Sequence, residues 1–170
     1  LDAIAFSRGP GSFTSLRIGI GVVQGLAWAS DRPVIPVSSL AATAQVATKE
    51  GIGSALVALD ARMKEVFTGT FETNNNGIMV PVSDEKVCPP ETVQPPDRSG
   101  TFGIGNGFDR YPSLDALSDR LVGVRPDIWP KASSILQLAQ EWLKTNEPLS
   151  AEQAQPVYLR DNVAKKEKDR

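Results

Sequence analysis

Hydrophobic and polar positions change period in a regular order along the first third of the chain. Ile4 and Phe6 alternate with small residues, so residues 1–6 predict a strand, whereas residues 12–29 have helical spacing. A second strand is predicted at 34–37, and a second helix at 39–47 with Ser38 or Ser39 as its cap. This strand–helix–strand–helix order is typical of an α/β fold with parallel strands.

A different pattern begins at residue 55. Residues 55–60 form an apolar run that predicts a buried strand, and residues 65–72 alternate with period two, which predicts a strand with one solvent-facing side. Asn and Gly at 74–77 predict a hairpin turn, and Pro81 places the returning strand at a sheet edge. Further on, we expect a short strand at 101–104, a short helix at 114–121, a serine-capped amphipathic helix at 133–144 and an extended segment at 155–160.

The predicted helix at 12–29, which Ser12 or Thr14 could cap, is apolar on two sides. One stripe at three- and four-residue spacing consists of Thr14, Ile18, Gly21, Gly25 and Trp28. The other stripe consists of Leu16, Ile20, Val23 and Ala27. Only Arg17 and Gln24 form a polar line between them. A helix beside its own sheet needs one apolar stripe, so the second stripe needs another cover.

Glycines on the first stripe would let another helix backbone approach closely, which favours a protein partner. The alternative is that other parts of the same chain cover both stripes. We therefore expect a partner-binding surface formed by Ser12, Phe13, Thr14, Arg17, Ile18, Gly21, Val22, Gly25 and Trp28.

Composition narrows the range of functions. The 170 residues are 41% hydrophobic and 22% charged, with a net charge of −2, which is ordinary for a globular protein and gives no overall attraction for nucleic acid. A single cysteine, Cys88, fits a reducing compartment, and we expect a cytoplasmic protein. The chain has no histidine, which removes the commonest general base and metal ligand, so we expect no catalytic, cofactor-binding or metal-binding residues.

Two segments could nevertheless hold a phosphate or a metal. Glycines at 9 and 11 precede the first helix, as in phosphate loops, but the segment lacks the lysine of the Walker pattern, and the glycines at 19, 21 and 25 lie inside the helix. A structural turn explains them better. Asp60 follows a buried strand, where a metal-binding carboxylate could lie, but we favour an aspartate that caps the turn and pairs with Arg62. Glycines at 103, 105 and 107 could approach a nucleotide, although a flexible strand end is our preferred interpretation.

Residues 9–19 and 24–26 resemble the signature of the TsaB (YeaZ) family, and the segments 37–40, 60–62, 65–67 and 156–164 follow in family order. The resemblance implies an α/β fold of the actin-like ATPase type (ASKHA, ribonuclease H-like) with two subdomains, the first incomplete. We expect residues 1–42 to be the remainder of the N-terminal subdomain and residues 43–150 to be the C-terminal subdomain. Residues 151–170 are expected to be a C-terminal segment that ends in a charged tail.

The resemblance also implies a function in the synthesis of N6-threonylcarbamoyladenosine at position 37 of tRNA. Family members are non-catalytic subunits that bind the transferase TsaD as a heterodimer and recruit the ATPase TsaE, so tRNA is contacted only through the complex. Family members begin with strands and a helix that this sequence lacks, so we expect it to lack the N-terminal segment. Two alternatives stay open: an actin-like enzyme that binds and hydrolyses ATP alone, and a homodimer that pairs through the same helix.

Overall fold

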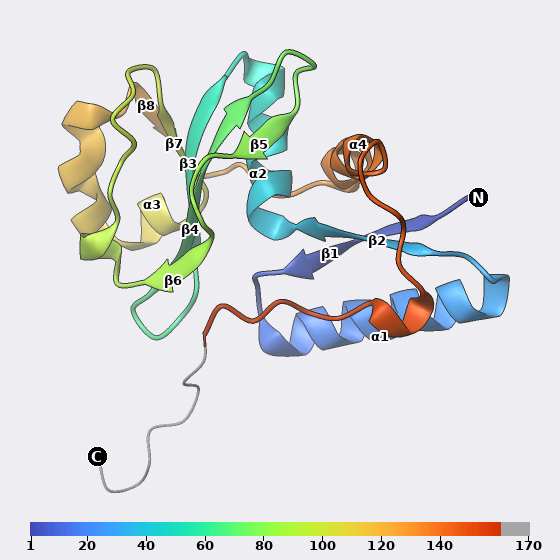
Figure 1. Cartoon of the computed structure of the whole chain (residues 1–170). Helices are drawn as coiled ribbons and strands as arrows, with labels where there is room; N and C mark the ends of the chain where they lie inside the picture. The colour runs from blue at the N-terminus through green and yellow to red at the C-terminus, as the bar shows by residue number, and fades with distance from the viewer. Residues whose placement is uncertain (161–170) are drawn as a thin grey trace, which may run out of the picture.

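A computed structural model of the chain, which describes residues 1–160, contains two β-sheets (Figure 1). In the smaller sheet, β1 (Ile4–Gly9) pairs in parallel with β2 (Val34–Ser38), as the sequence predicted. The connecting helix α1 (Phe13–Ser30) lies below this sheet in Figure 1, and α4 (Ala132–Trp142) lies above it. The charged tail expected at 165–170 lies outside the described residues.

The larger sheet has the strand order β5-β4-β3-β7-β8, with β6 paired to β4. Its strands are β3 (Ser54–Asp60), β4 (Val66–Thr73), β5 (Met79–Pro81), β6 (Lys86–Cys88), β7 (Phe102–Ile104) and β8 (Gly123–Arg125). The predicted strands at 55–60, 65–72 and 101–104 are confirmed, and Pro81 lies in an outer strand as its missing N–H requires.

Helices cover both faces of the larger sheet. Helix α2 (Ser39–Ala47) packs on one face, and α3 (Gly107–Arg110) lies on the other (Figure 1). The described part of the chain also contains four 3₁₀ helices: η1 (Thr48–Glu50), η2 (Pro90–Thr92), η3 (Pro112–Arg120) and η4 (Ala151–Gln153). Within residues 1–160, no helix has both the length and the apolar character that a bilayer crossing requires.

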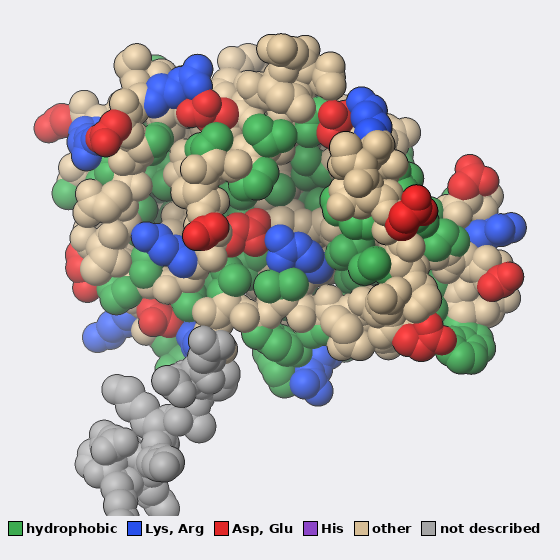
Figure 2. All heavy atoms as spheres, in the orientation of Figure 1, with side chains coloured by type: hydrophobic (Ala, Val, Ile, Leu, Met, Phe, Trp, Pro, Cys, Tyr) green, Lys and Arg blue, Asp and Glu red, His purple; other side chains and the backbone are tan. Residues whose placement is uncertain are grey.

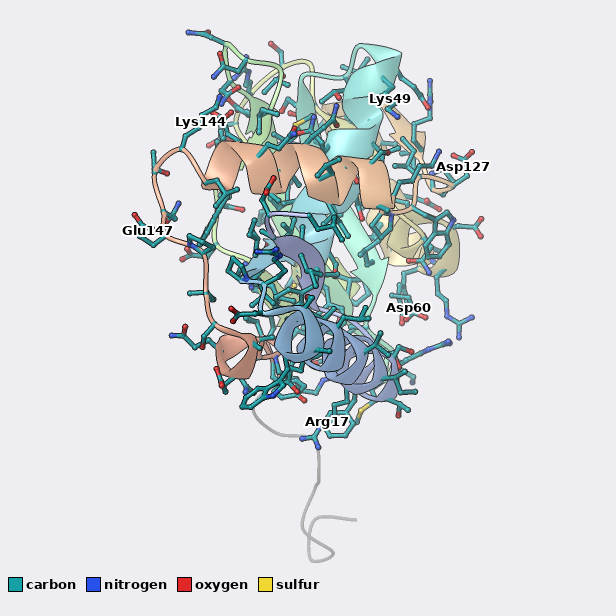
Figure 3. The ribbon with its side chains drawn as sticks, turned by 90° about the vertical axis from the view of Figure 1, so that its right-hand side faces the viewer. Arg17, Lys49, Asp60, Asp127, Lys144 and Glu147 are labelled. Atoms are coloured by element: carbon teal, nitrogen blue, oxygen red, sulfur yellow. The ribbon has the colours of Figure 1, made fainter. Side chains whose placement is uncertain are left out.

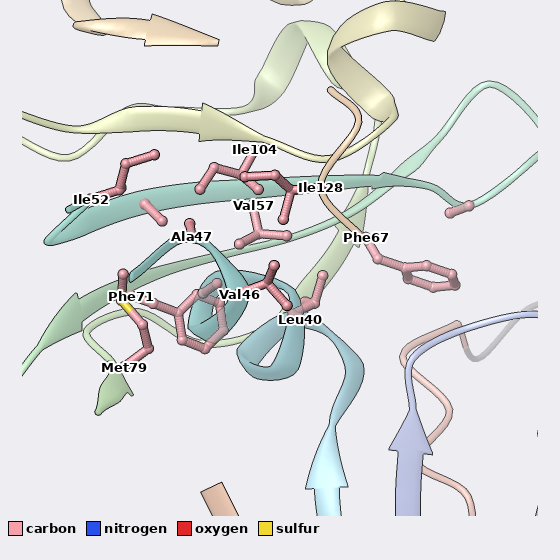
Figure 4. Close-up of a cluster of buried hydrophobic side chains, with 13 residues drawn as sticks. Leu40, Val46, Ala47, Ile52, Val57, Phe67, Phe71, Met79, Ile104 and Ile128 are labelled. Carbon is pink, nitrogen blue, oxygen red and sulfur yellow. The ribbon is translucent and has the colours of Figure 1, made fainter. Parts of the chain in front are cut away.

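The main core lies between α2 and the larger sheet. Leu40 of α2 is fully buried against Val57, Ile104 and Phe71, which come from three different strands (Figure 4). A Leu-to-Ala change at such a site typically costs about 2–5 kcal/mol. Because α2 follows β2 directly, this core also connects the two sheets.

Two expectations about solvent and capping were wrong. Strand β4 has no solvent-facing side over residues 66–71, because α2 packs on one face and Val93 packs with Val66 on the other. Ser12 lies at the N-cap of α1, but its side chain makes no capping hydrogen bond, and Thr14 lies inside the helix. Since this end of α1 is exposed, water can satisfy its free N–H groups.

A serine bonds the first turn of each of the other two long helices, but a serine is the N-cap residue only in α2, so the predicted serine cap of α4 is wrong. Ser38 Oγ accepts hydrogen bonds from the N–H groups of Leu40 and Ala41, at 3.1 and 3.3 Å, which confirms its predicted cap of α2. At α4 the N-cap is Lys131, and Ser134 in the first turn accepts a bond from its N–H at 3.2 Å. The subdomain boundaries stay a prediction, and α4 packs against β1 and β2 of the smaller sheet.

Candidate functional site

The two apolar stripes of α1 have different surroundings. On the second stripe, Ile20 and Ala27 are 5% and 1% exposed, and they pack with Phe6 and Val34 of the smaller sheet. On the first stripe, Ile18 is 64% exposed. The chain therefore covers one stripe of its own helix and leaves the other open.

The open side of α1 extends over its whole length, and hydrophobic side chains lie along the lower edge of the molecule (Figure 2). We call this surface the exposed face of α1; it consists of Phe13, Ile18, Gly21, Val22, Gly25, Leu26 and Trp28. Leu26, which was not among the predicted partner-binding residues, is 57% exposed. Ser12 and Thr14 are exposed at the start of the helix.

Gly21 and Gly25 leave the middle of this face without side chains. A Cβ atom placed on Gly21 or Gly25 would have no neighbour within 4 Å. Neither glycine is therefore required by packing inside the chain. Their positions between exposed apolar side chains fit the close approach of a second helix.

The first turn of α1 carries an aromatic and cationic cluster that includes a residue from the other end of the chain. Phe13 stacks on Tyr158, with ring centroids 5.6 Å apart. The guanidinium of Arg17 lies 4.3 Å from the centre of the Phe13 ring, and its Nε donates to the Tyr158 hydroxyl at 3.1 Å. Tyr158 was not predicted as a site residue, because no local pattern places it beside Phe13.

The C-terminal segment that carries Tyr158 runs along α1 toward the turn between β3 and β4 (Figure 1). Gln24 donates to the carbonyl of Ala154 at 3.0 Å, and the N–H of Val157 donates to the carbonyl of Arg8 at 2.8 Å. Arg160 then pairs with Glu65 and donates to the carbonyl of Ala61 at 3.1 Å. The segment predicted at 155–160 is extended, and it connects the smaller sheet to the larger one.

A cleft of about 820 Å³ lies between the start of α1, the end of β3 and the C-terminal segment. Ser12 and Phe13 line it from α1, Asp60 and Arg62 line it from the end of β3, and Tyr158 lines it from the C-terminal segment. Gly9 sits beside the cleft with φ +98°, and a Cβ there would approach Val157 O to 3.2 Å. Packing within the chain thus accounts for this glycine and supports a structural turn.

Asp60 is the cleft's carboxylate, and its oxygens are already bonded. Oδ1 accepts from the Tyr111 hydroxyl at 2.7 Å and from the Arg62 N–H at 2.9 Å. Oδ2 lies 3.4 Å from Arg62 Nη1 and 3.5 Å from Arg110 Nε. Figure 3 shows Asp60 at the right-hand edge of the molecule, below α4 and above Arg17 in that view.

These partners explain the electrostatics of Asp60. Burial by itself raises the pKa of Asp60, but the hydrogen bonds from Tyr111 and Arg62 and the two arginine charges together hold that pKa below its usual value. Burial, followed by the bond to Asp60, raises the pKa of Tyr111. Residues 1–160 contain no group of three carboxylate or cysteine side chains that could hold a metal ion. The contacts of Asp60 fit the predicted aspartate that caps the turn and pairs with Arg62.

The glycines after β7 also serve the fold. Gly105 has φ +101°, and a Cβ at Gly105 or Gly107 would come within 2.7 or 2.8 Å of the Ala58 carbonyl oxygen. Asn106, between them, accepts a hydrogen bond from the Asp60 N–H at 3.0 Å. The expected flexible strand end is wrong, because these residues pack tightly against the end of β3.

Comparison with known proteins shows which family the chain resembles. The family model described as "TsaD: tRNA N6-adenosine threonylcarbamoyltransferase" matches residues 1–100. The chain is 39% identical to the tRNA threonylcarbamoyladenosine biosynthesis protein TsaB of Escherichia coli, over 96% of the chain and 73% of that protein. It is 36% identical to TsaB of Haemophilus influenzae, over 96% of the chain and 72% of that protein.

Solved structures of YeaZ and of a YeaZ-like protein are also similar to the chain. A crystal structure from Pseudomonas aeruginosa, described as an uncharacterised protein with similarity to peptidase YeaZ, has a TM-score of 0.83 and 43% identity, over 94% of this chain and 74% of that one. A structure described as YeaZ from Pseudomonas aeruginosa has a TM-score of 0.82 with the same identity and coverage. The chain belongs to the TsaB (YeaZ) family of tRNA threonylcarbamoyladenosine biosynthesis proteins and has its actin-like α/β fold.

Proposed function

We propose that the chain is a non-catalytic subunit in N6-threonylcarbamoyladenosine synthesis, which binds a TsaD-type transferase through the exposed face of α1. The observation that carries the proposal is an apolar helix face that the chain leaves open along its length, with Gly21 and Gly25 in the middle. Burial of side chains such as Ile18, Val22 and Leu26 would contribute about 1.5–3 kcal/mol each. The TsaD subunit would in turn recruit TsaE, and tRNA would be contacted through the assembly.

The likeness to TsaD supports a partner of the same fold. The TsaD family model matches residues 1–100, which include α1 and both strands of the smaller sheet. A TsaD protein of Staphylococcus epidermidis is 49% identical over 41 residues. Two related chains can pair through corresponding helices about an approximate two-fold axis, as copies do in a symmetric dimer. We therefore propose a heterodimer in which a TsaD helix packs on Gly21 and Gly25.

The cleft supports a non-catalytic role. Asp60 bonds to Tyr111, Arg62 and Arg110, so its oxygens are already used within the chain. The sequence contains no histidine that could replace it as a base or ligand. These contacts do not favour the alternative of an ATP-hydrolysing enzyme that acts alone.

The test is the affinity of the chain for a TsaD protein, measured by calorimetry with a Gly25→Leu variant. The leucine side chain would occupy the space that the partner helix needs. Because such overpacking costs about 1–3 kcal/mol, we expect the affinity for TsaD to fall about tenfold to a hundredfold. Since Gly25 has open space around it and leucine favours helix by about 1 kcal/mol over glycine, the variant should stay folded.

The matched control is Gln140→Leu, which adds an exposed leucine to a different helix, α4. Affinity should be unchanged in this variant. Equal TsaD affinity for the Gly25→Leu and unchanged chains would refute the proposal. If size-exclusion chromatography shows a homodimer that the Gly25→Leu change dissociates, and the chain does not bind TsaD, the homodimeric alternative is favoured instead.

A further inference from the structure

Arg17 is the single charged residue within α1, and its side chain is held in a fixed position. The Phe13 ring lies beneath the guanidinium at 4.3 Å, and Nε donates to the Tyr158 hydroxyl at 3.1 Å. The ring of Tyr158 stacks on Phe13 in turn. Figure 3 shows Arg17 below α1, directed away from the helix.

These contacts use one face of the guanidinium and its Nε atom. The two terminal nitrogens, Nη1 and Nη2, make no hydrogen bond or ion pair with any of residues 1–160. By contrast, Arg160, only two residues from Tyr158, uses its terminal nitrogen Nη2 on both Glu65 and the carbonyl of Ala61. Among the described residues, the outer edge of Arg17 is therefore a fork of donors with no partner.

Resting on the proposed function, we infer that Arg17 binds a carboxylate on the partner's facing helix, and that Phe13 and Tyr158 are positioning residues for it. Arginine and carboxylate match in a bidentate geometry, and a guanidinium held on an aromatic ring loses little entropy on binding. The partner surface is then an apolar helix with an aspartate or glutamate near one end. The carboxylate sets which end of that helix lies against the first turn of α1.

The surroundings favour a protein carboxylate over a nucleic-acid phosphate. Nucleic-acid backbones are bound by several cations, each of which neutralises a phosphate. Here one arginine stands at the end of a face formed by Ile18, Val22, Leu26 and Trp28. An isolated charge in an apolar surface is typical of a protein interface, where tryptophan, tyrosine and arginine dominate the affinity.

The experiment measures the dissociation constant of the chain for a TsaD protein over a series of salt concentrations. We expect Arg17→Gln to weaken binding about tenfold or more at low salt, as at an interface hot spot, and to flatten the salt dependence. Arg17→Lys keeps the charge without the fork and should restore the salt dependence but only part of the affinity. Tyr158→Phe keeps the stack and should bind better than Tyr158→Ala.

The matched control is Arg125→Gln, because Arg125 also lies over an aromatic ring, that of Phe102 at 5.6 Å, but at the far edge of the larger sheet. Its removal should leave affinity and salt dependence unchanged. If Arg17→Gln binds with unchanged affinity and an unchanged salt slope while Gly25→Leu is impaired, the inference is wrong and the proposed function stands. If the unchanged chain does not bind TsaD, both are wrong.

Discussion

At the scale of single residues, Asp60 shows how an acidic residue in a cleft can serve the fold. Its side chain is only 6% exposed, yet it stays charged because Tyr111 and Arg62 donate hydrogen bonds to it and Arg110 lies close. Such bonds to a charged group contribute about 1.5–3 kcal/mol each. The residue therefore holds the turn after β3 against α3.

We predict that Asp60→Asn destabilises the chain at pH 7 and that this effect shrinks at acid pH. The pKa of Asp60 is lower in the folded chain than its usual value, so its stabilisation is complete above about pH 4 and is lost as pH falls through the folded pKa. Urea unfolding at pH 7 and pH 3 measures the difference. Asp109→Asn, at an exposed acid in α3, is the control, and an equal loss at both pH values would contradict the prediction.

At the scale of elements, two serines at helix starts look alike in the sequence and differ in the structure. Ser38 bonds the first turn of α2 and also donates to Glu85 from the segment between β5 and β6. Ser12 occupies the same position before α1, but its side chain makes no capping bond. Residue type predicts where a helix begins, whereas the capping contact depends on how the surrounding chain holds the serine.

We predict that Ser38→Ala lowers the free energy of unfolding by about 0.5–2 kcal/mol, as expected for loss of a helix cap. Ser12→Ala is the matched control and should change it by much less, because no cap bond is lost. Chemical denaturation of both variants under the same conditions makes the comparison. Equal destabilisation by the two changes would contradict the prediction that the hydrogen bonds of Ser38 stabilise α2.

At the scale of the whole molecule, the periodicity of the sequence predicted both strands of the smaller sheet and the strands β3, β4, β5 and β7 of the larger one, but not its short outer strands β6 and β8. It also separated the packed stripe of α1, with Ile20 and Ala27, from the open stripe with Ile18. It could not predict that Tyr158 lies on Phe13, because that contact joins positions 145 residues apart and depends on the complete fold. The C-terminal segment, which completes the candidate site, had no periodic signal of its own.

That segment also stabilises a strained turn. Arg62, Met63 and Lys64, between β3 and β4, all have positive φ, at 61°, 53° and 62°, which costs about 1–2 kcal/mol for each such residue. Arg160 holds this turn by its pair with Glu65 and its bond to the carbonyl of Ala61. The turn therefore depends on a contact from the far end of the chain.

We predict that Arg160→Gln increases amide hydrogen exchange in this turn and at Val157, whose N–H bonds to Arg8, by about tenfold, the effect of losing roughly 1.4 kcal/mol of local stability. Exchange at the buried Val57 of β3 should be unchanged, because the core does not use Arg160. Arg98→Gln, which removes the exposed pair with Glu72, is the control. If exchange rises equally at Val57, the change acts on global unfolding, and the C-terminal segment is not a local tie between the two sheets.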